Sequence, residues 1–155
     1  MRFAGLNLLS LQSLLIFFAL SALSPQARAQ GEVPKIVGTW KLNLAKSQFG
    51  GPPTRNLVHK WTWDGEALSH SIGDNKPNWS AKFDGKPYPV SGAENGSVRL
   101  TRVDAYTTQL IETNGKITSN FRQVVSKDGK TLTITRKSTT EAGQPVVDIE
   151  VFDRQ

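Results

Sequence analysis

The chain has 155 residues and a formal net charge of +6, from 19 lysines and arginines against 13 aspartates and glutamates. It contains no cysteine, which excludes disulfides, thiolate metal sites, thiol catalysis and haem attachment through cysteine. Basic and acidic residues alternate along the sequence without a polybasic block, so the charge predicts a mildly cationic, solvated surface and no nucleic-acid interface.

The first 29 residues have the pattern of a cleaved signal peptide. Arg2 precedes a largely apolar run over 8–23, and Ala27-Arg28-Ala29 gives a small-x-small exit. The alternative, a transmembrane anchor, is disfavoured because polar residues interrupt the run and a span needs about 20 apolar residues. We therefore expect one exported domain over 30–155, periplasmic or secreted, with no stable membrane insertion after cleavage.

The first predicted strand covers 36–44. Ile36, Gly38, Trp40, Leu42 and Leu44 fall on one face of a strand with period two, and polar residues fall on the other. A strand that is apolar on one side only must place that side against a core. Gly38 and Trp40 are therefore interpreted as a structural motif at the start of a packed interior.

Asp-Gly and Asn-Gly pairs then recur at 64, 84, 95, 114 and 128, and such pairs favour tight hairpin turns. No segment shows a sustained helical period. Strands are predicted near 36–44, 55–63, 66–72, 77–83, 86–90, 97–103, 106–113, 116–126, 130–138 and 146–153. This succession predicts an all-β fold, an antiparallel up-and-down β-barrel of about 8–10 strands, because closure hides the sheet edges.

A two-residue turn at Asp64-Gly65 would place His59 directly opposite His70, with Trp61 opposite Leu68 on the same face. Opposed residues have Cβ atoms about 4.5–5.5 Å apart, close enough for two imidazoles to share a proton, a ligand or a metal. A zinc site needs at least three protein ligands and no third is evident, so no metal is predicted. The alternatives are hydrogen bonding to a ligand and a simple aromatic wall.

Two-residue turns at Asp128-Gly129 and Ala142-Gly143 would likewise fix how the last three strands pair. The first turn would place Phe121 opposite Arg136, and the second would place Arg136 opposite Ile149. These registers predict a common set of inward side chains from the last five strands. The set is Val98, Leu100, Arg102, Leu110, Ile117, Phe121, Val125, Leu132, Ile134, Arg136, Val147, Ile149 and Val151.

Gly38-x-Trp40 near the start of the expected domain resembles the opening motif of lipocalins and of the related fatty-acid-binding proteins. A longer string, Gly-Thr-Trp-Lys-Leu-Asn with Val-Val-Ser-Lys-Asp-Gly-Lys at 124–130, is similar to small exported bacterial proteins of no established activity. The resemblance implies a barrel that holds a small hydrophobic or amphipathic ligand. Two features depart from it: the connection over 45–54 is too rich in glycine and proline for a helical lid, and the final-strand Arg-x-Tyr is unmatched.

An inward arginine among apolar residues must find a carboxylate, carbonyl groups or an aromatic face, because leaving a buried charge unpaired is costly. Arg102 or Arg136 could therefore anchor an anionic head group, as the resemblance to fatty-acid-binding proteins implies. The alternative is a structural arginine stacked on Trp40, a role for which Arg154 competes.

Three tryptophans and both histidines fall in the second to fourth predicted strands, which makes these strands the expected wall of a pocket. The candidate ligand-binding residues are His59, Trp61, His70, Trp79, Phe83, Tyr88, Arg102, Phe121 and Arg136. The sequence favours carriage of a small apolar or amphipathic molecule, with a solidly packed structural or protein-interaction module as the alternative. Enzymatic use of the histidine pair is disfavoured because neither histidine has a flanking nucleophile motif, and no cofactor is expected.

Overall fold

The computed structural model describes residues 32–53, 57–73 and 77–155. The expected signal peptide over 1–29 lies outside the described residues. Within them, no helix has both the length and the apolar character needed to cross a membrane.

The described chain forms ten β-strands and one short 3-10 helix. Their bounds are β1 (Gly38–Leu42), η1 (Leu44–Lys46), β2 (Val58–Trp63), β3 (Leu68–Ile72), β4 (Trp79–Ala81), β5 (Tyr88–Pro89), β6 (Gly96–Arg102), β7 (Thr107–Asn114), β8 (Ile117–Val125), β9 (Thr131–Thr139) and β10 (Pro145–Arg154). Each predicted strand is confirmed, with ends that differ by a few residues. The predicted all-β, up-and-down class is therefore correct.

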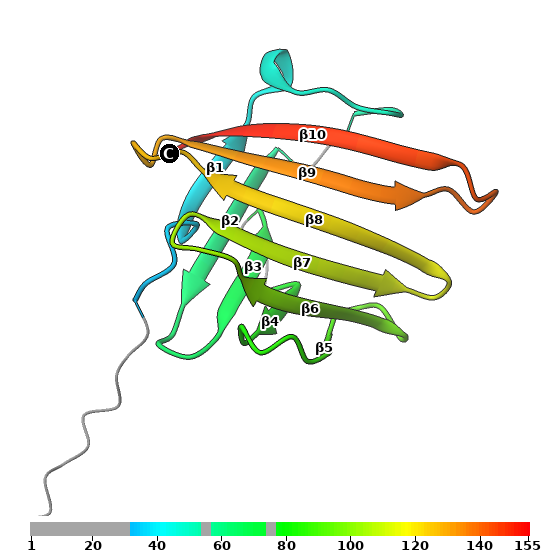
Figure 1. Ribbon diagram of the computed structural model, residues 1–155, viewed down its shortest axis with the longest axis horizontal. Coiled ribbons are helices and arrows are strands. Elements are labelled where there is room, and N and C mark those ends of the chain that lie inside the picture. Colours follow the sequence, from blue (N-terminus) through cyan, green and yellow to red (C-terminus); the bar gives the residue numbers. More distant parts are fainter. Residues whose placement is uncertain (1–31, 54–56, 74–76) are drawn as a thin grey trace, which may run out of the picture.

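All neighbouring strands pair antiparallel in the order β4-β3-β2-β1-β10-β9-β8-β7-β6-β5. An isolated bridge between Trp79 and Val90 joins β4 to the segment after β5, so the barrel is nearly closed. Figure 1 shows β6 to β10 as one layer crossing in front of β1 to β4. We call the end with the turns at 64–67, 103–106 and 126–130 the tryptophan end, and the end with the turns at 115–116 and 140–144 the acidic end.

The turn between β2 and β3 is longer than predicted. Trp63 pairs with Leu68, so His70 lies opposite Trp61 rather than opposite His59. The Asp64 carboxylate accepts hydrogen bonds from the backbone N–H groups of Glu66 (2.9 Å) and Ala67 (2.7 Å), which closes a four-residue loop. Because the register shifts by two residues, the predicted inward face survives although the individual pairs are wrong.

The predicted register between β9 and β10 is also wrong, and here the error is one residue. Arg136 pairs with Asp148, not with Ile149. The loop has five residues, closed by hydrogen bonds from Thr140 N–H to the Gln144 carbonyl (2.8 Å) and from Gly143 N–H to the Thr140 carbonyl (2.9 Å). A one-residue shift exchanges the two faces of a strand. Val147, Ile149 and Val151 therefore point outward, and Asp148, Glu150 and Phe152 point inward.

The predicted register between β8 and β9 is correct. Phe121 pairs with Arg136 and Val125 with Leu132. Val98 and Leu100 are fully buried, which confirms the inward face of β6. The face predicted for the first strand ends at Leu42, because Leu44 lies in η1 and is 50% exposed.

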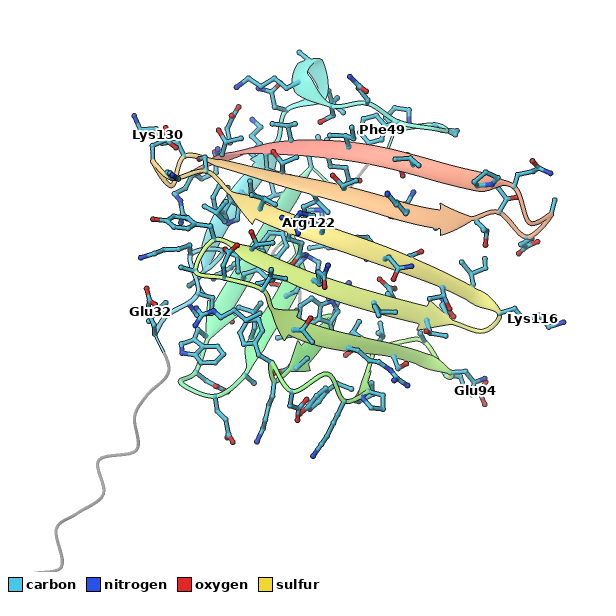
Figure 2. All side chains as sticks on the ribbon, viewed as in Figure 1. Glu32, Phe49, Glu94, Lys116, Arg122 and Lys130 are labelled. Atoms are coloured by element: carbon cyan, nitrogen blue, oxygen red, sulfur yellow. The ribbon has the colours of Figure 1, made fainter. Side chains whose placement is uncertain are left out.

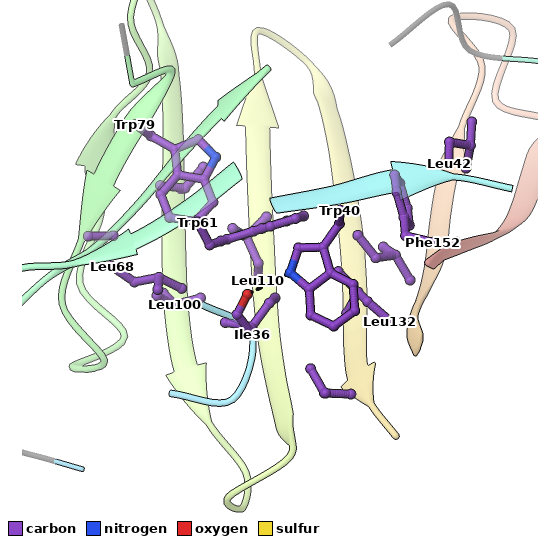
Figure 3. Close-up of a cluster of buried hydrophobic side chains, with 14 residues drawn as sticks. Ile36, Trp40, Leu42, Trp61, Leu68, Trp79, Leu100, Leu110, Leu132 and Phe152 are labelled. Atoms are coloured by element: carbon purple, nitrogen blue, oxygen red, sulfur yellow. Dashed lines mark hydrogen bonds between the residues drawn. The ribbon is translucent and has the colours of Figure 1, made fainter. Parts of the chain in front are cut away.

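Trp40 anchors the core at the tryptophan end (Figure 3). Its indole N–H donates to the Ile36 carbonyl at 2.8 Å, and the Arg154 guanidinium carbon lies 4.1 Å from its ring centroid. Arg154 also donates to the carbonyls of Lys35, Val37 and Gly129. Arg154 is thus the structural arginine stacked on Trp40.

Position 38 requires a glycine. Its φ of +142° is rare for residues with side chains, and an added Cβ would lie 2.4 Å from Arg154 Nη1. The glycine of the Gly38-x-Trp40 motif therefore makes room for the guanidinium that covers the indole.

Candidate functional site

An interior pocket of about 200 Å³ lies at the acidic end. Its walls come from the inward positions of β7, β8 and β9. They are Glu112, Asn114, Ile117, Ser119, Phe121 and Arg136. Charged inward residues begin at this end of the strands, because Leu110 is followed by Glu112 and Ile134 by Arg136.

Arg136 is already paired within this pocket. Its Nε donates to Asp148 Oδ2 at 2.8 Å, and its Nη2 forms an ion pair with the same oxygen. The other Asp148 oxygen accepts from the backbone N–H of Gly50 at 2.8 Å. Asp148 is only 2% exposed, so its negative charge is held in place against the guanidinium. The positive charge that was predicted to anchor an anion is therefore compensated by a buried carboxylate.

Two further carboxyl groups lie near Arg136. Burial raises the pKa of Glu112, while the positive charge of Arg136 acts in the opposite direction. Burial also raises the pKa of Glu150, with Arg136 lowering it and Asp148 raising it. One guanidinium thus faces three carboxyl groups, and the interior at this end carries net negative charge when all are ionised.

A larger hollow of about 630 Å³ lies between the β7–β8 and β9–β10 turns. It shares Asn114 and Ile117 with the interior pocket, so the pocket opens toward solvent between these two turns. The hollow is lined by Asn114, Gly115, Lys116, Ile117, Thr139, Thr140, Glu141 and Gly143. A small molecule could reach Glu112 through this mouth.

The predicted aromatic wall exists on β2 to β4. His70 lies against both neighbouring indoles, with ring centroids 4.7 Å from Trp61 and 5.4 Å from Trp79. His59 contacts Phe152, which lies on the other side of β1, with ring centroids 4.9 Å apart. The two histidines meet diagonally, and His70 Nε2 lies 3.1 Å from His59 Nδ1.

His70 is an uncharged member of this aromatic wall at neutral pH. Burial and the neighbouring His59 lower the pKa of His70 to about 3, so this ring is neutral near pH 7. Among the described residues, no group of three metal-ligating side chains occurs. Trp61 Nε1 and His70 Nδ1 are buried and have no hydrogen-bond partner in the described part of the chain. They can pair with a polar atom inside the barrel.

The other predicted site residues lie apart from the pocket. Arg102, at the tryptophan end, donates to the Glu32 carbonyl at 2.9 Å and lies 5.6 Å from the centroid of the Phe83 ring. Tyr88 donates its hydroxyl hydrogen to Asp84 at 2.9 Å. Of the nine candidates, Phe121 and Arg136 line the acidic-end pocket, and His59, Trp61, His70 and Trp79 form the wall.

The carboxylates were not among the predicted site residues. Glu112 could have been found, because it lies two residues from Leu110 on the predicted inward face of the same strand. Asp148 and Glu150 could not have been found, because the predicted two-residue turn exchanged the two faces of β10 and so placed these residues outside. The alternation Val147, Ile149, Val151 favoured that choice, since it is the more apolar face.

No protein-family model matches the sequence, and no curated protein matches it. Three chains among solved structures match the fold. A Schistosoma mansoni fatty-acid-binding protein in complex with arachidonic acid is 17% identical, with a TM-score of 0.54 over 78% of this chain and 96% of that chain. The fluorescent protein UnaG is 16% identical, with a TM-score of 0.50 over 78% of this chain and 98% of that chain. The predicted resemblance to fatty-acid-binding-type barrels is confirmed for the fold.

Proposed function

We propose that the barrel binds a small amphipathic molecule in the pocket at the acidic end. The apolar part of the ligand packs on Phe121 and Ile117, and its polar end lies at Glu112. The fold supports this proposal, because a fatty-acid-binding protein with the same architecture holds arachidonic acid. The mouth between the β7–β8 and β9–β10 turns gives access.

The charge balance of the pocket is the observation that defines the ligand class. Arg136 is neutralised by Asp148, and Glu112 and Glu150 add negative charge in a partly desolvated space. A carboxylate head group would meet like charges at low effective dielectric, whereas an ammonium or hydroxyl group would pair with them. The polar end of the ligand is therefore cationic or a hydrogen-bond donor, and not the anion that Arg136 alone suggested.

Three compounds of one shape test this assignment: 2-phenylethylamine, 2-phenylethanol and phenylacetate. The pocket fits molecules of about ten heavy atoms, so each can be titrated and followed by NMR chemical shifts at pH 7. We expect the amine to bind most tightly and the carboxylate at least fivefold more weakly. Tighter binding of phenylacetate would contradict the charge assignment, and binding of none of the three would contradict the pocket.

A matched pair of variants locates the effect. Glu112→Gln keeps the size of the side chain and removes its charge, so the preference for the amine over the alcohol should fall severalfold. Glu94→Gln removes an exposed carboxylate from the turn before β6 and should leave the preference unchanged. Equal effects of the two variants would show that the preference reflects net charge only.

A second function, a packed structural or interaction module, is favoured by the tryptophan end alone. There the indoles of Trp40 and Trp61 are fully buried within the hydrophobic core cluster. Native mass spectrometry of protein purified from its source distinguishes the two functions. A retained small molecule supports binding, and a bare chain under gentle conditions supports the module.

We also propose that the protein acts outside the cytoplasm, in the periplasm or beyond the cell. The basic start, apolar run and small-x-small pattern over 1–29 support export, and the absence of cysteine is compatible with an oxidising compartment. The intact mass of the protein from its source tests this. A chain that begins at Gln30 supports cleavage, and a chain that retains residues 1–29 contradicts it.

A further inference from the structure

A second hollow, of about 540 Å³, lies on the outer face of β6 to β9. Its lining combines three cationic side chains with hydroxyl and amide groups. It consists of Gly85, Arg99, Thr101, Gln109, Leu110, Ile111, Asn120, Phe121, Arg122, Thr135 and Lys137. Figure 2 shows Arg122 in the middle of this face.

The strand registers explain why the cations gather. Arg99 pairs with Ile111, Ile111 with Asn120, and Asn120 with Lys137, so these four side chains form one row across four strands. Arg122 stands two residues along β8, in the next row. With strands about 4.8 Å apart and two residues spanning about 6.8 Å, the Cα atoms of the three cations lie roughly 8 to 14 Å from one another. Long basic side chains can therefore converge on one molecule.

No carboxylate of the described residues lines the hollow beside these three cations. In the part of the chain that the structure describes, Arg99, Arg122 and Lys137 form no ion pair with a carboxylate. Asp104, in the β6–β7 turn, attracts Arg122 electrostatically. Its carboxylate accepts a hydrogen bond from the Tyr106 N–H at 2.7 Å. The positive charge of this face can therefore attract an anionic molecule.

We propose that this hollow binds a sugar that carries at least two phosphate or carboxylate groups. Guanidinium groups bind such anions with paired hydrogen bonds, and a lysine adds a point charge. Gln109 and Asn120 offer amides to sugar hydroxyls, and Ile111 offers a half-exposed apolar surface to the ring. The volume falls in the range of about 300–1,000 Å³ that small-molecule sites occupy.

Fructose 1,6-bisphosphate and fructose form a matched pair of probes for this site. We expect the bisphosphate to bind with affinity that weakens as salt rises, and fructose to bind at least tenfold more weakly. In an NMR titration, the shifted backbone amides should belong to the outer-face rows of β6 to β9. Shifts confined to Glu112, Ser119 and the 140–144 turn would place the anion in the interior pocket and overturn this proposal, together with the charge assignment of that pocket.

Charge-removing variants complete the test. Arg122→Gln, at the centre of the hollow, should weaken bisphosphate binding about tenfold, and Lys137→Gln by about threefold. Lys60→Gln removes an exposed charge from the outer face of β2, and it should have no effect. Equal losses in all three variants, or no binding by the wild-type protein at millimolar probe, would overturn the proposal. Binding to phosphatidylglycerol vesicles that exceeds binding to the bisphosphate would identify a lipid head group instead and would also overturn it.

Discussion

The two ends of the barrel use arginine in opposite ways. At the tryptophan end, Arg154 covers the Trp40 ring and donates to three backbone carbonyls, so its guanidinium stabilises the fold. At the acidic end, Arg136 is held by Asp148 beside two more carboxyl groups in a space open to solvent. The first arrangement packs this end of the barrel with buried side chains, whereas the second places charged groups beside a pocket that a ligand can enter.

This difference suggests that one end of the strands stabilises the fold and the other end binds the ligand. Apolar and aromatic side chains that stabilise the fold gather at one end, and groups whose burial costs free energy gather at the other. Substitutions at the tryptophan end should therefore lower stability, and neutral substitutions at the acidic end should raise it while weakening binding.

Trp40→Ala should have the largest effect. The substitution removes a fully buried indole, its hydrogen bond to Ile36 and the surface on which Arg154 stacks. We expect a loss of about 3–5 kcal/mol in the free energy of unfolding, measured by urea denaturation. Trp63→Ala, at a half-buried position, should cost clearly less. Equal losses would mean that the core does not centre on Trp40.

Gly38→Ala should have the second-largest effect on stability. It combines a backbone conformation that disfavours side chains with a contact of the new Cβ against Arg154, so we expect a loss of about 1–3 kcal/mol. Gly51→Ala is the matched control, because an added Cβ there meets no atom within 4 Å. If Gly38→Ala were as stable as Gly51→Ala, the glycine would not be needed beside the guanidinium.

The stability of the protein should fall as the pH drops from about 6.5. The unfolded chain binds a proton at His70 below this ordinary pKa, whereas the folded chain does not until about pH 3. One such proton costs at most about 1.4 kcal/mol per pH unit, or about 1 kcal/mol between pH 6 and pH 5.

Urea denaturation at pH 7, 6 and 5 measures this slope above the pKa of ordinary aspartates. His70→Gln should have a smaller slope than the wild-type protein, because it removes the titrating group. Identical slopes in the two proteins would show that His70 is not the group responsible.

Glu112→Gln should have the smallest effect on stability and the opposite sign. Burial raises the pKa of Glu112, so ionising this carboxyl costs more free energy in the folded chain than in the unfolded chain. Replacing it should stabilise the protein at pH 7 by about 0.5 kcal/mol or more, an advantage that disappears as the pH falls and the native carboxyl becomes protonated. A loss of stability at pH 7 would indicate that Glu112 is held by an attractive interaction.

The sequence predicted the ten strands and most of the inward face because the barrel is built from local turns with clear signatures. Asp128-Gly129 forms the predicted turn, and the Phe121–Arg136 pair followed from it. Where the loop was longer by an even number of residues, as at Asp64, the face survived. The 140–144 loop is longer by an odd number, and the charged face of β10 was therefore assigned to the outside.

The candidate site was predicted only in part, for the same reason. Arg136 and Phe121 were placed correctly, but the residue that neutralises Arg136 lies on the strand whose faces were exchanged. No periodicity in the sequence distinguishes a two-residue turn from the five-residue loop that hydrogen bonds of Thr140 close. The charge of the pocket became visible only when the strands were assembled.

The central claim is that the acidic end of the barrel holds the apolar part of a ligand with its donor group at Glu112. Intermolecular NOEs between 2-phenylethylamine and the protein measure this directly. We expect contacts from the phenyl protons to the side chains of Phe121 and Ile117, and these contacts should weaken in Glu112→Gln at the same ligand concentration. Contacts confined to the outer face of β6 to β9, or phenyl contacts that persist unchanged in Glu112→Gln, would contradict it.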